Sequence, residues 1–280
     1  MKKLHGEIMN NLIGTLIRCG DVTEERIAFY QQIGLNALQL AGVYDEYLAD
    51  TAEARAKSDA LFALFEKYSL KVPGLFLSYT NQNWRDITNT IGITPESFRC
   101  TRMIASCRQM VWAKRYGIKY ISCHIGELPA EDSESYKKFA AEFKELVKFA
   151  SELDLEFLLE TGMEDADGLA KFFAEVNEST LGLNLDPANL IYYNCDKPLN
   201  VLQRHRSAVK VVHCKDAVPG AETVLGQGAV DFEGFLQDVV KNGFTGPLII
   251  ERELPFGPEQ ENDVKNAVKY INSIIKGAEK

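Results

Sequence analysis

Short apolar runs alternate with longer amphipathic stretches along the whole chain, and this alternation occurs about eight times. Each run is about five to eight residues long, the length of a parallel strand that is buried on both faces. The predicted strands are residues 11–17, 35–41, 71–77, 118–125, 155–161, 181–186, 208–214 and 247–253.

The stretches between these runs have the pattern of helices that cover a sheet. One begins after Thr23, a favoured N-cap residue, and stops at Gly34. Residues 258–277 close the chain with a similar amphipathic pattern. Within residues 132–153, apolar side chains recur at helical spacing on one face, at Phe139, Phe143, Leu146, Val147, Ala150 and Leu153.

Eight rounds of strand and helix predict an α/β protein with a closed (β/α)₈ TIM barrel, formed as a single domain by residues 1–280. The alternative is an open, doubly wound sheet. That fold usually carries a GxGxxG turn after its first strand, and "IGTLIRCG" does not match it. Residues 78–97 form a long polar segment after the third strand, and we expect a loop there that forms part of a lid over the site.

Composition and charge narrow the function classes. The chain has 280 residues, 46% of them hydrophobic, and a net charge of −9. An acidic surface repels phosphate backbones, which argues against a nucleic-acid partner. The six cysteines show no CxxC spacing, no apolar stretch approaches the roughly 20 residues of a membrane span, and the first residues lack the apolar core of a signal peptide. We therefore expect a cytoplasmic protein without membrane partners.

The predicted strand ends carry the candidate chemistry, because barrel enzymes build their active sites at the C-terminal ends of the strands. The fourth to eighth strands end in residues that can bind a metal, namely His124, Glu160, Asp186, His213 and Glu251. The first three strands offer nothing comparable.

A single acid at a strand end is usually solvated or caps the next helix, and Asp186 before Pro187 fits a turn. Neighbouring strand ends share one space, however, because parallel strands lie about 4.8 Å apart. Glu160, Asp186 and Glu251 would repel one another there unless a cation or a proton lay between them. We therefore expect that they and His213 bind one divalent metal ion, Mn²⁺ or Mg²⁺ first, with Co²⁺ or Zn²⁺ as alternatives.

Six motifs occur in order along the chain: "HIGELP", "LETG", "NLDPANLIYYN", "VHCKDA", "GQGAVDF" and "IERE". Together they resemble the sugar phosphate isomerase/epimerase family of xylose-isomerase-like TIM barrels. The resemblance covers nearly the whole chain and is strongest from residue 118 onward. It implies that Glu160, Asp186, His213 and Glu251 are the metal ligands. It also implies that Glu160 and Glu251 are the acid/base pair.

The resemblance implies a metal-dependent sugar isomerase or epimerase that acts through a cis-enediolate. Free-ketose 3-epimerases of this superfamily carry a histidine three residues after the metal aspartate, where this chain has Asn189. They also carry an arginine after the seventh strand, where Val218 and Pro219 stand. These departures argue against a tagatose or psicose 3-epimerase. The alternative activity is a metal-dependent dehydratase, a lyase acting on a keto-cyclitol or keto-sugar.

Both activities begin by removing a proton beside a carbonyl group. We expect Glu160 to remove it and Glu251 to return a proton, whereas loss of a hydroxyl from the same intermediate would give dehydration. Three further residues are expected to bind substrate. His124 would contact a hydroxyl unless it is only a satisfied histidine, Asn189 would orient a hydroxyl or only cap a turn, and Lys215 would hold a substrate oxygen or only pair with Asp216 or Glu251.

Other classes fit less well. A DNA-repair endonuclease of the same superfamily needs several zinc ions and many histidines, and this chain has 4 histidines. A catalytically silent sugar-binding module would not need both Glu160 and Glu251. We expect a small sugar or keto-sugar as partner, and an acidic chain without a visible basic phosphate pocket favours one without phosphate. "GQGAVDF" is read as a tight turn before a helix at Asp231 and not as a phosphate-binding loop. Dimers and tetramers are common in the family, so a homo-oligomer is consistent with it.

Overall fold

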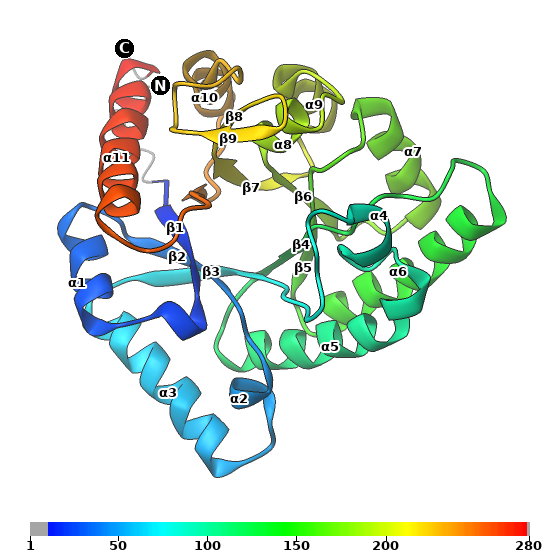
Figure 1. Ribbon diagram of the computed structural model, residues 1–280, viewed down its shortest axis with the longest axis horizontal. Coiled ribbons are helices and arrows are strands. Elements are labelled where there is room, and N and C mark those ends of the chain that lie inside the picture. Colours follow the sequence, from blue (N-terminus) through cyan, green and yellow to red (C-terminus); the bar gives the residue numbers. More distant parts are fainter. Residues whose placement is uncertain (1–10, 279–280) are drawn as a thin grey trace, which may run out of the picture.

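Eight parallel strands close into a barrel in the computed structural model, which describes residues 11–278 (Figure 1). The strands lie in the order β1-β10-β7-β6-β5-β4-β3-β2. They are β1 (Ile13–Arg18), β2 (Ala37–Ala41), β3 (Lys71–Phe76), β4 (Tyr120–Cys123), β5 (Glu156–Glu160), β6 (Leu181–Leu185), β7 (Val209–Cys214) and β10 (Leu248–Ile250). The predicted (β/α)₈ barrel is confirmed. The single domain of residues 1–280 and the absence of a signal peptide stay predictions, because residues 1–10 and 279–280 lie outside the described residues.

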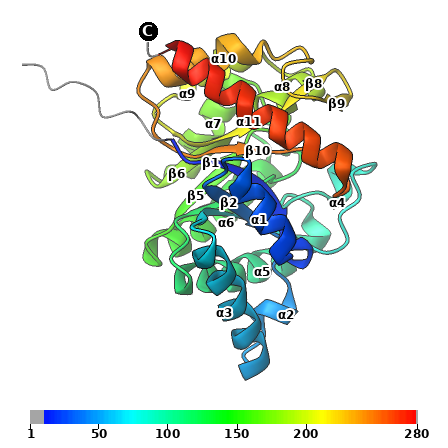
Figure 2. The ribbon, with the colours of Figure 1, turned by 90° about the vertical axis from the view of Figure 1, so that its left-hand side faces the viewer.

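Helices surround the barrel, and Figure 2 shows α11 and α1 side by side on its outer face. The long helices are α1 (Glu24–Gln32), α3 (Ala52–Lys67), α5 (Glu96–Arg115), α6 (Glu134–Glu152), α7 (Ala166–Val176), α9 (Pro198–His205), α10 (Phe232–Lys241) and α11 (Pro258–Ala278). Shorter elements are the 3₁₀ turn η1 (Cys19–Asp21) and the helices α2 (Asp45–Leu48), α4 (Ile87–Thr90) and α8 (Pro187–Tyr192). None of the helices in residues 11–278 has the length and apolar character needed to cross a membrane.

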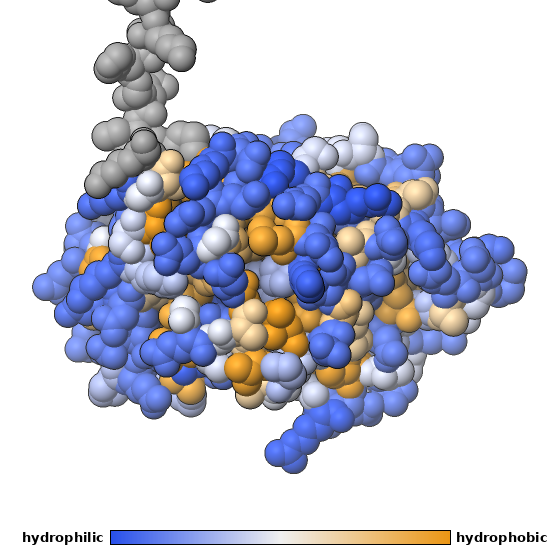
Figure 3. Space-filling view, turned by 90° about the horizontal axis from the view of Figure 1, so that it is seen from above, coloured by the Kyte–Doolittle hydropathy of each residue, from blue (hydrophilic) through white to orange (hydrophobic). Residues whose placement is uncertain are grey.

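The helix signals in the sequence act as expected. The Thr23 side chain accepts a hydrogen bond from the Arg26 amide and caps α1, and Gly34 ends that helix with a φ of 97°. The predicted apolar face of α6 is buried, with Leu153 partly buried at its end. Its Phe143 packs edge-on against Phe157 of β5 at 5.2 Å between ring centroids. Hydrophilic residues cover most of the face seen in Figure 3, with apolar residues between them.

Two cores result from this arrangement. The larger lies between the strands and the helices, and a smaller one joins Leu158, Val211 and Ile249 of β5, β7 and β10. Since β5 and β7 are not neighbours in the sheet, this contact is made through the barrel interior. Side chains two residues apart on a strand point to the same side. Glu160, His213 and Glu251 each follow one of these three apolar residues by two positions, so the apolar cluster forms a floor beneath them.

Three segments differ from the expectations. The predicted strand 247–253 is paired only over Leu248–Ile250, so Glu251 follows the strand directly. Residues 78–97 are more than a polar loop, because they contain α4 and buried isoleucines, and the amide of Ile93 bonds to the Ile125 carbonyl. An antiparallel hairpin, β8 (Asp216–Val218) and β9 (Ala221–Thr223), follows β7 outside the barrel.

Candidate metal centre

Four consecutive strands of the barrel bring the four predicted ligands together. Glu160 is the last residue of β5, Asp186 follows β6, His213 lies near the end of β7, and Glu251 follows β10. The sheet order β10-β7-β6-β5 makes these strands neighbours. One ligand atom from each residue falls within 4.8 Å of the other three. The sequence prediction that these side chains share one space is therefore confirmed.

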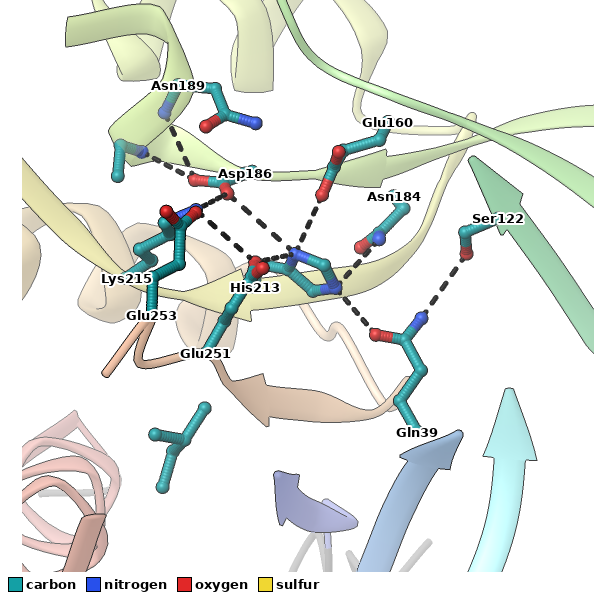
Figure 4. Close-up of polar contacts among 12 residues, drawn as sticks. Gln39, Ser122, Glu160, Asn184, Asp186, Asn189, His213, Lys215, Glu251 and Glu253 are labelled. Carbon is teal, nitrogen blue, oxygen red and sulfur yellow. Dashed lines mark hydrogen bonds and ion pairs between the residues drawn. The ribbon is translucent and has the colours of Figure 1, made fainter. Parts of the chain in front are cut away.

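The Nδ1 atom of His213 lies at the middle of the cluster (Figure 4). It is 3.0 Å from Glu160 Oε1, 2.8 Å from Glu251 Oε2 and 3.8 Å from Asp186 Oδ2. The side chains of His213 and Asp186 are fully buried, and that of Glu251 is 16% exposed. Three carboxylates thus converge on one imidazole nitrogen in a place that water hardly reaches.

The donor atoms fit a divalent cation. Asp186 Oδ2, His213 Nδ1 and Glu251 Oε2 are buried and lack a hydrogen-bond partner among the described residues. Buried polar atoms without partners are costly and rare, and here they all point into the same space. Three carboxylate oxygens with one imidazole suit a hard or borderline ion such as Mg²⁺, Mn²⁺ or Zn²⁺.

Asp186 has two roles, one for each oxygen. Its Oδ1 accepts hydrogen bonds from the amides of Ala188 at 2.8 Å and Asn189 at 3.2 Å, so it caps α8. Its backbone amide and carbonyl are both bonded to the Thr161 hydroxyl. These contacts leave Oδ2 to face the cluster. The turn-starting role and the metal role considered for this residue are compatible.

The second nitrogen of His213 is held by polar side chains from other strands. Nε2 lies 2.7 Å from Gln39 Oε1 and 2.8 Å from Asn184 Nδ2. Gln39 comes from β2, reaches across the barrel interior and also contacts Ser122 of β4 (Figure 4). The imidazole is therefore oriented from both sides, with Nδ1 toward the carboxylates.

The electrostatics of the cluster differ between its two glutamates. Burial raises the pKa of Glu160 to about 7, and His213 offsets this only in part. Burial would also raise the pKa of Glu251, but Lys215 and His213 outweigh it and lower that pKa to about 2. Burial lowers the pKa of His213, yet the surrounding acids, Glu251 foremost, hold it well above its ordinary value. The acids thus favour a protonated His213, and a divalent cation bound among the carboxylates would take the place of that proton.

Lys215 brings a second positive charge to the edge of the cluster. Its buried ammonium lies 3.6 Å from both Asp186 Oδ2 and Glu251 Oε2 and forms an ion pair with Glu253. Burial lowers the pKa of Lys215, but Glu251 and the other acids raise it well above its ordinary range. Of the two pairings considered for Lys215, the one with Glu251 is present. The Asp216 carboxylate instead binds backbone amides, among them those of Gly226 and Gly228 at 3.0 Å each.

His124, directly after β4, adds a donor beside the cluster. Its Nδ1 accepts a hydrogen bond from the Gly126 amide at 3.1 Å, so the neutral ring carries its proton on Nε2, which is buried without a partner. Burial, reinforced by Lys215, lowers the pKa of His124 to about 4. Trp84 lies edge-on to this ring at 5.6 Å between centroids, and 56% of Trp84 is exposed.

Comparison with known proteins identifies the family of this chain. A family model described as a xylose isomerase-like TIM barrel matches residues 27–274. The chain belongs to the xylose isomerase-like TIM barrel family.

Relatives within the family differ in activity. An L-ribulose-5-phosphate 3-epimerase UlaE of Escherichia coli is 23% identical over 91% of this chain and 90% of its own. An inosose dehydratase of Clostridium botulinum is 27% identical, but the match spans only 42% of each chain. A solved xylose isomerase domain protein of Planctomyces limnophilus is 28% identical, with a TM-score of 0.86 over 95% of this chain and 98% of the other. Another, from Mycobacterium smegmatis and in complex with magnesium, is 14% identical over 96% of this chain and 98% of the other, with a TM-score of 0.70.

In this member of the xylose isomerase-like family, Asn189 and the glycine motif both make contacts within the fold. Asn189 donates from Nδ2 to the Thr161 carbonyl at 3.0 Å, which ties the start of α8 to the end of β5. The glycine motif forms the expected turn before α10, and its amides bind the Asp216 carboxylate. An internal anion thus takes the donors that a phosphate would need. The substrate role of Asn189 stays a prediction.

Sequence reasoning missed two polar groups that complete the centre. Gln39 lies in "ALQLA" and Asn184 in "LGLNL", and both are buried within apolar strands. A lone amide in a strand that is otherwise apolar is the available signal, because burying it is costly unless it has a partner. Glu253 was also missed as the ion-pair partner of Lys215. It is exposed for 57% of its side chain and resembles any surface acid in the sequence.

Proposed function

We propose that this chain is a divalent-metal-dependent sugar isomerase or epimerase with Glu160 and Glu251 as its proton-transfer pair. One observation carries the proposal. The two carboxylates come from the outer members of four consecutive strands and approach the same nitrogen of His213, at 3.0 and 2.8 Å. A substrate carbon placed over this centre would have one carboxylate on either side.

We propose Mn²⁺ or Mg²⁺ as the ion, with Glu160, Asp186, His213 and Glu251 as its ligands. When bound, it supplies a positive charge that acidifies the C–H bond beside a carbonyl and stabilises the charge that develops on oxygen. Glu160 removes the proton from carbon to form a cis-enediolate. Glu251 takes up a proton from solvent and passes it to the opposite face, which inverts the centre, or to the neighbouring carbon, which moves the carbonyl, and Glu160 then releases its proton to solvent.

Two groups at the edge of the centre would position the substrate. The unpartnered Nε2–H of His124 can donate to a sugar hydroxyl, and the Lys215 ammonium can donate to a substrate oxygen. The exposed ring of Trp84 beside His124 gives an apolar surface for the face of a sugar. The six cysteines are all unpaired, which supports work in a reducing compartment, the cytoplasm.

Hydrogen exchange tests the proposal directly. The protein is loaded with Mn²⁺ and incubated in deuterated water with free ketoses, pentulose phosphates and inososes, and the recovered sugars are analysed by mass spectrometry and NMR. We expect deuterium at one carbon-bound position of at least one ketose. Absence of exchange across the panel, with bound Mn²⁺ verified, would contradict the proposal.

The second candidate is a dehydratase, favoured by the partial match to inosose dehydratases. Elimination of a hydroxyl from the same enediolate would yield an enone. An absorbing product formed from an inosose, without an epimer of any ketose, would favour this lyase over the isomerase.

A further inference from the structure

The proposed centre depends on which nitrogen of His213 carries a hydrogen. A neutral imidazole has one N–H and one lone pair, so the nitrogen that binds a cation must be the bare one. Here Nδ1 faces the three carboxylates and Nε2 faces the barrel interior. The centre can bind a cation well only if the hydrogen stays on Nε2.

Gln39 offers the acceptor for that hydrogen. Its Oε1 lies 2.7 Å from Nε2 of His213, and its Nε2 lies 3.4 Å from the Ser122 hydroxyl, to which it donates. The contact with Ser122 uses the amide nitrogen and leaves the oxygen toward His213. Asn184 also lies beside Nε2, with its donor nitrogen Nδ2 at 2.8 Å, so this amide supports a hydrogen on Nε2 only if it turns over. Its Oδ1 is buried without a partner, and a half rotation of its amide would make that oxygen a second acceptor.

The position of Gln39 is unusual for a barrel strand. Barrel interiors are filled in layers by side chains from alternate strands, mostly branched apolar ones. Gln39, Ser122 and Asn184 come from β2, β4 and β6, and each is at most 1% exposed. A buried amide destabilises a fold unless its hydrogen bonds are made. Gln39 and Asn184 both contact His213, and Ser122 bonds to Gln39, so the three polar groups are explained by a set of contacts that ends at the imidazole.

We infer that Gln39 is a positioning residue that keeps the hydrogen of His213 on Nε2, so that Nδ1 is free to bind a divalent cation. This inference rests on the proposed metal centre and goes beyond it. Gln39 does not touch the cation or the substrate. Its carbonyl oxygen acts through the imidazole, as second partners of metal-binding histidines do.

Metal affinity tests this inference without any substrate. Mn²⁺ is titrated into the metal-free protein by calorimetry, for the wild type and for Gln39→Met and Gln39→Glu. Methionine keeps the volume and lacks the acceptor, whereas glutamate keeps an acceptor. We expect Gln39→Met to bind Mn²⁺ about 10- to 100-fold more weakly than the wild type, and Gln39→Glu to bind it within about threefold of the wild type.

Gln109→Met is the matched control. Gln109 is another buried glutamine, on α5, and its side-chain amide bonds to the backbone amide and carbonyl of Ser78 at 3.0 Å each. It makes no hydrogen bond to His213. The same substitution there should lower the melting temperature and leave Mn²⁺ affinity unchanged. Equal losses of affinity in Gln39→Met and Gln109→Met, or in Gln39→Met and Gln39→Glu, would show that packing alone is at work and overturn the inference.

Histidine NMR keeps the inference testable if a variant fails to fold. In ¹⁵N-histidine-labelled wild type loaded with Zn²⁺, we expect His213 to carry its hydrogen on Nε2, with the signal assigned through His213→Ala. A bare Nε2 would overturn the inference even if the metal binds. A wild type that binds neither Mn²⁺ nor Zn²⁺ would overturn the metal centre itself, and the inference with it. Tight binding by both wild type and Gln39→Met would remove only the role of Gln39.

Discussion

The two halves of this barrel end in different chemistry. Strands β5, β6, β7 and β10 deliver three acids and a histidine to one point, whereas β1 to β4 deliver none of the four ligands. The half formed by β1 to β4 instead contributes supporting groups, namely the Gln39 amide behind His213 and, after β3 and β4, the Trp84 ring and His124. The metal ligands lie on neighbouring strands, whereas the Gln39 side chain that orients His213 comes from across the barrel.

This difference follows from distances. Neighbouring parallel strands lie about 4.8 Å apart, so side chains at their ends can share one cation. A side chain from a strand that is not a neighbour must cross the interior, and the long side chain of Gln39 does so to reach the second nitrogen of His213. We call β5, β6, β7 and β10 with the residues that follow them the ligand half, and β1 to β4 with the residues that follow them the supporting half. We expect substitutions in the ligand half to abolish function and those in the supporting half to weaken it.

The largest effect is expected at Glu251 in the ligand half. Glu251→Gln keeps the shape but loses the proton-transfer carboxylate, so the rate of deuterium exchange into the substrate should fall by about 10³-fold. The rate is measured by mass spectrometry with Mn²⁺ in excess. Glu259→Gln on the exposed start of α11 is the control and should leave the rate unchanged. An active Glu251→Gln would remove Glu251 from the proton-transfer pair.

The second largest effect is expected at Asp186, on the affinity for the metal ion. Asp186→Asn can still cap α8 but removes a negative charge from the cluster, so Mn²⁺ affinity should fall by about 100-fold or more. Calorimetric titration measures it. Asp165 caps α7 through a bond from the Gly168 amide and lies outside the cluster, so Asp165→Asn should bind Mn²⁺ like the wild type. Similar losses in both variants would show that capping alone matters.

His124, at the boundary of the two halves, should make stability depend on pH. Its pKa in the folded protein is about 4, below the ordinary value of 6.5, so the unfolded chain takes up a proton first as the pH falls. Stability from this group is present above about pH 6.5 and is lost down to about pH 4. Between pH 7.5 and pH 5 the metal-free wild type should lose about 2 kcal/mol more than His124→Gln.

Urea denaturation at the two pH values measures this difference. Acid-sensitive groups other than His124 affect both proteins alike, so only the difference between them reports on this side chain. Parallel loss of stability in wild type and His124→Gln would show that His124 takes up its proton as readily in the folded state as in the unfolded chain.

The smallest effect is expected at Trp84 in the supporting half. Its ring is largely exposed beside His124, so Trp84→Ala removes apolar surface from the substrate side without touching the ligands. We expect kcat/KM to fall about tenfold, mainly through KM, with Mn²⁺ affinity unchanged. Steady-state kinetics and calorimetry check the two parts. A loss of Mn²⁺ affinity in this variant would contradict the division between the two halves.

Much of this molecule was readable from the pattern of its residues. Strand–helix alternation predicted the barrel, and the polar residues that follow apolar runs predicted all four members of the cluster. These residues could be found because the signal lies within each strand. A buried strand must be apolar, so an acid or histidine at its end stands out, and Glu160, His213 and Glu251 follow the floor residues Leu158, Val211 and Ile249 by the two-residue period of a strand.

Contacts between distant strands were decided only by the tertiary structure. Nothing in "ALQLA" shows that Gln39 meets His213, because that contact depends on barrel closure and on a side chain crossing the interior. The ion pair of Lys215 with Glu253, in place of one with its neighbour Asp216, likewise depends on backbone amides that occupy the Asp216 carboxylate. Sequence by itself determined which acids and histidines stand at the strand ends, since periodicity is a local property. Closure of the sheet decided which of their atoms face one another.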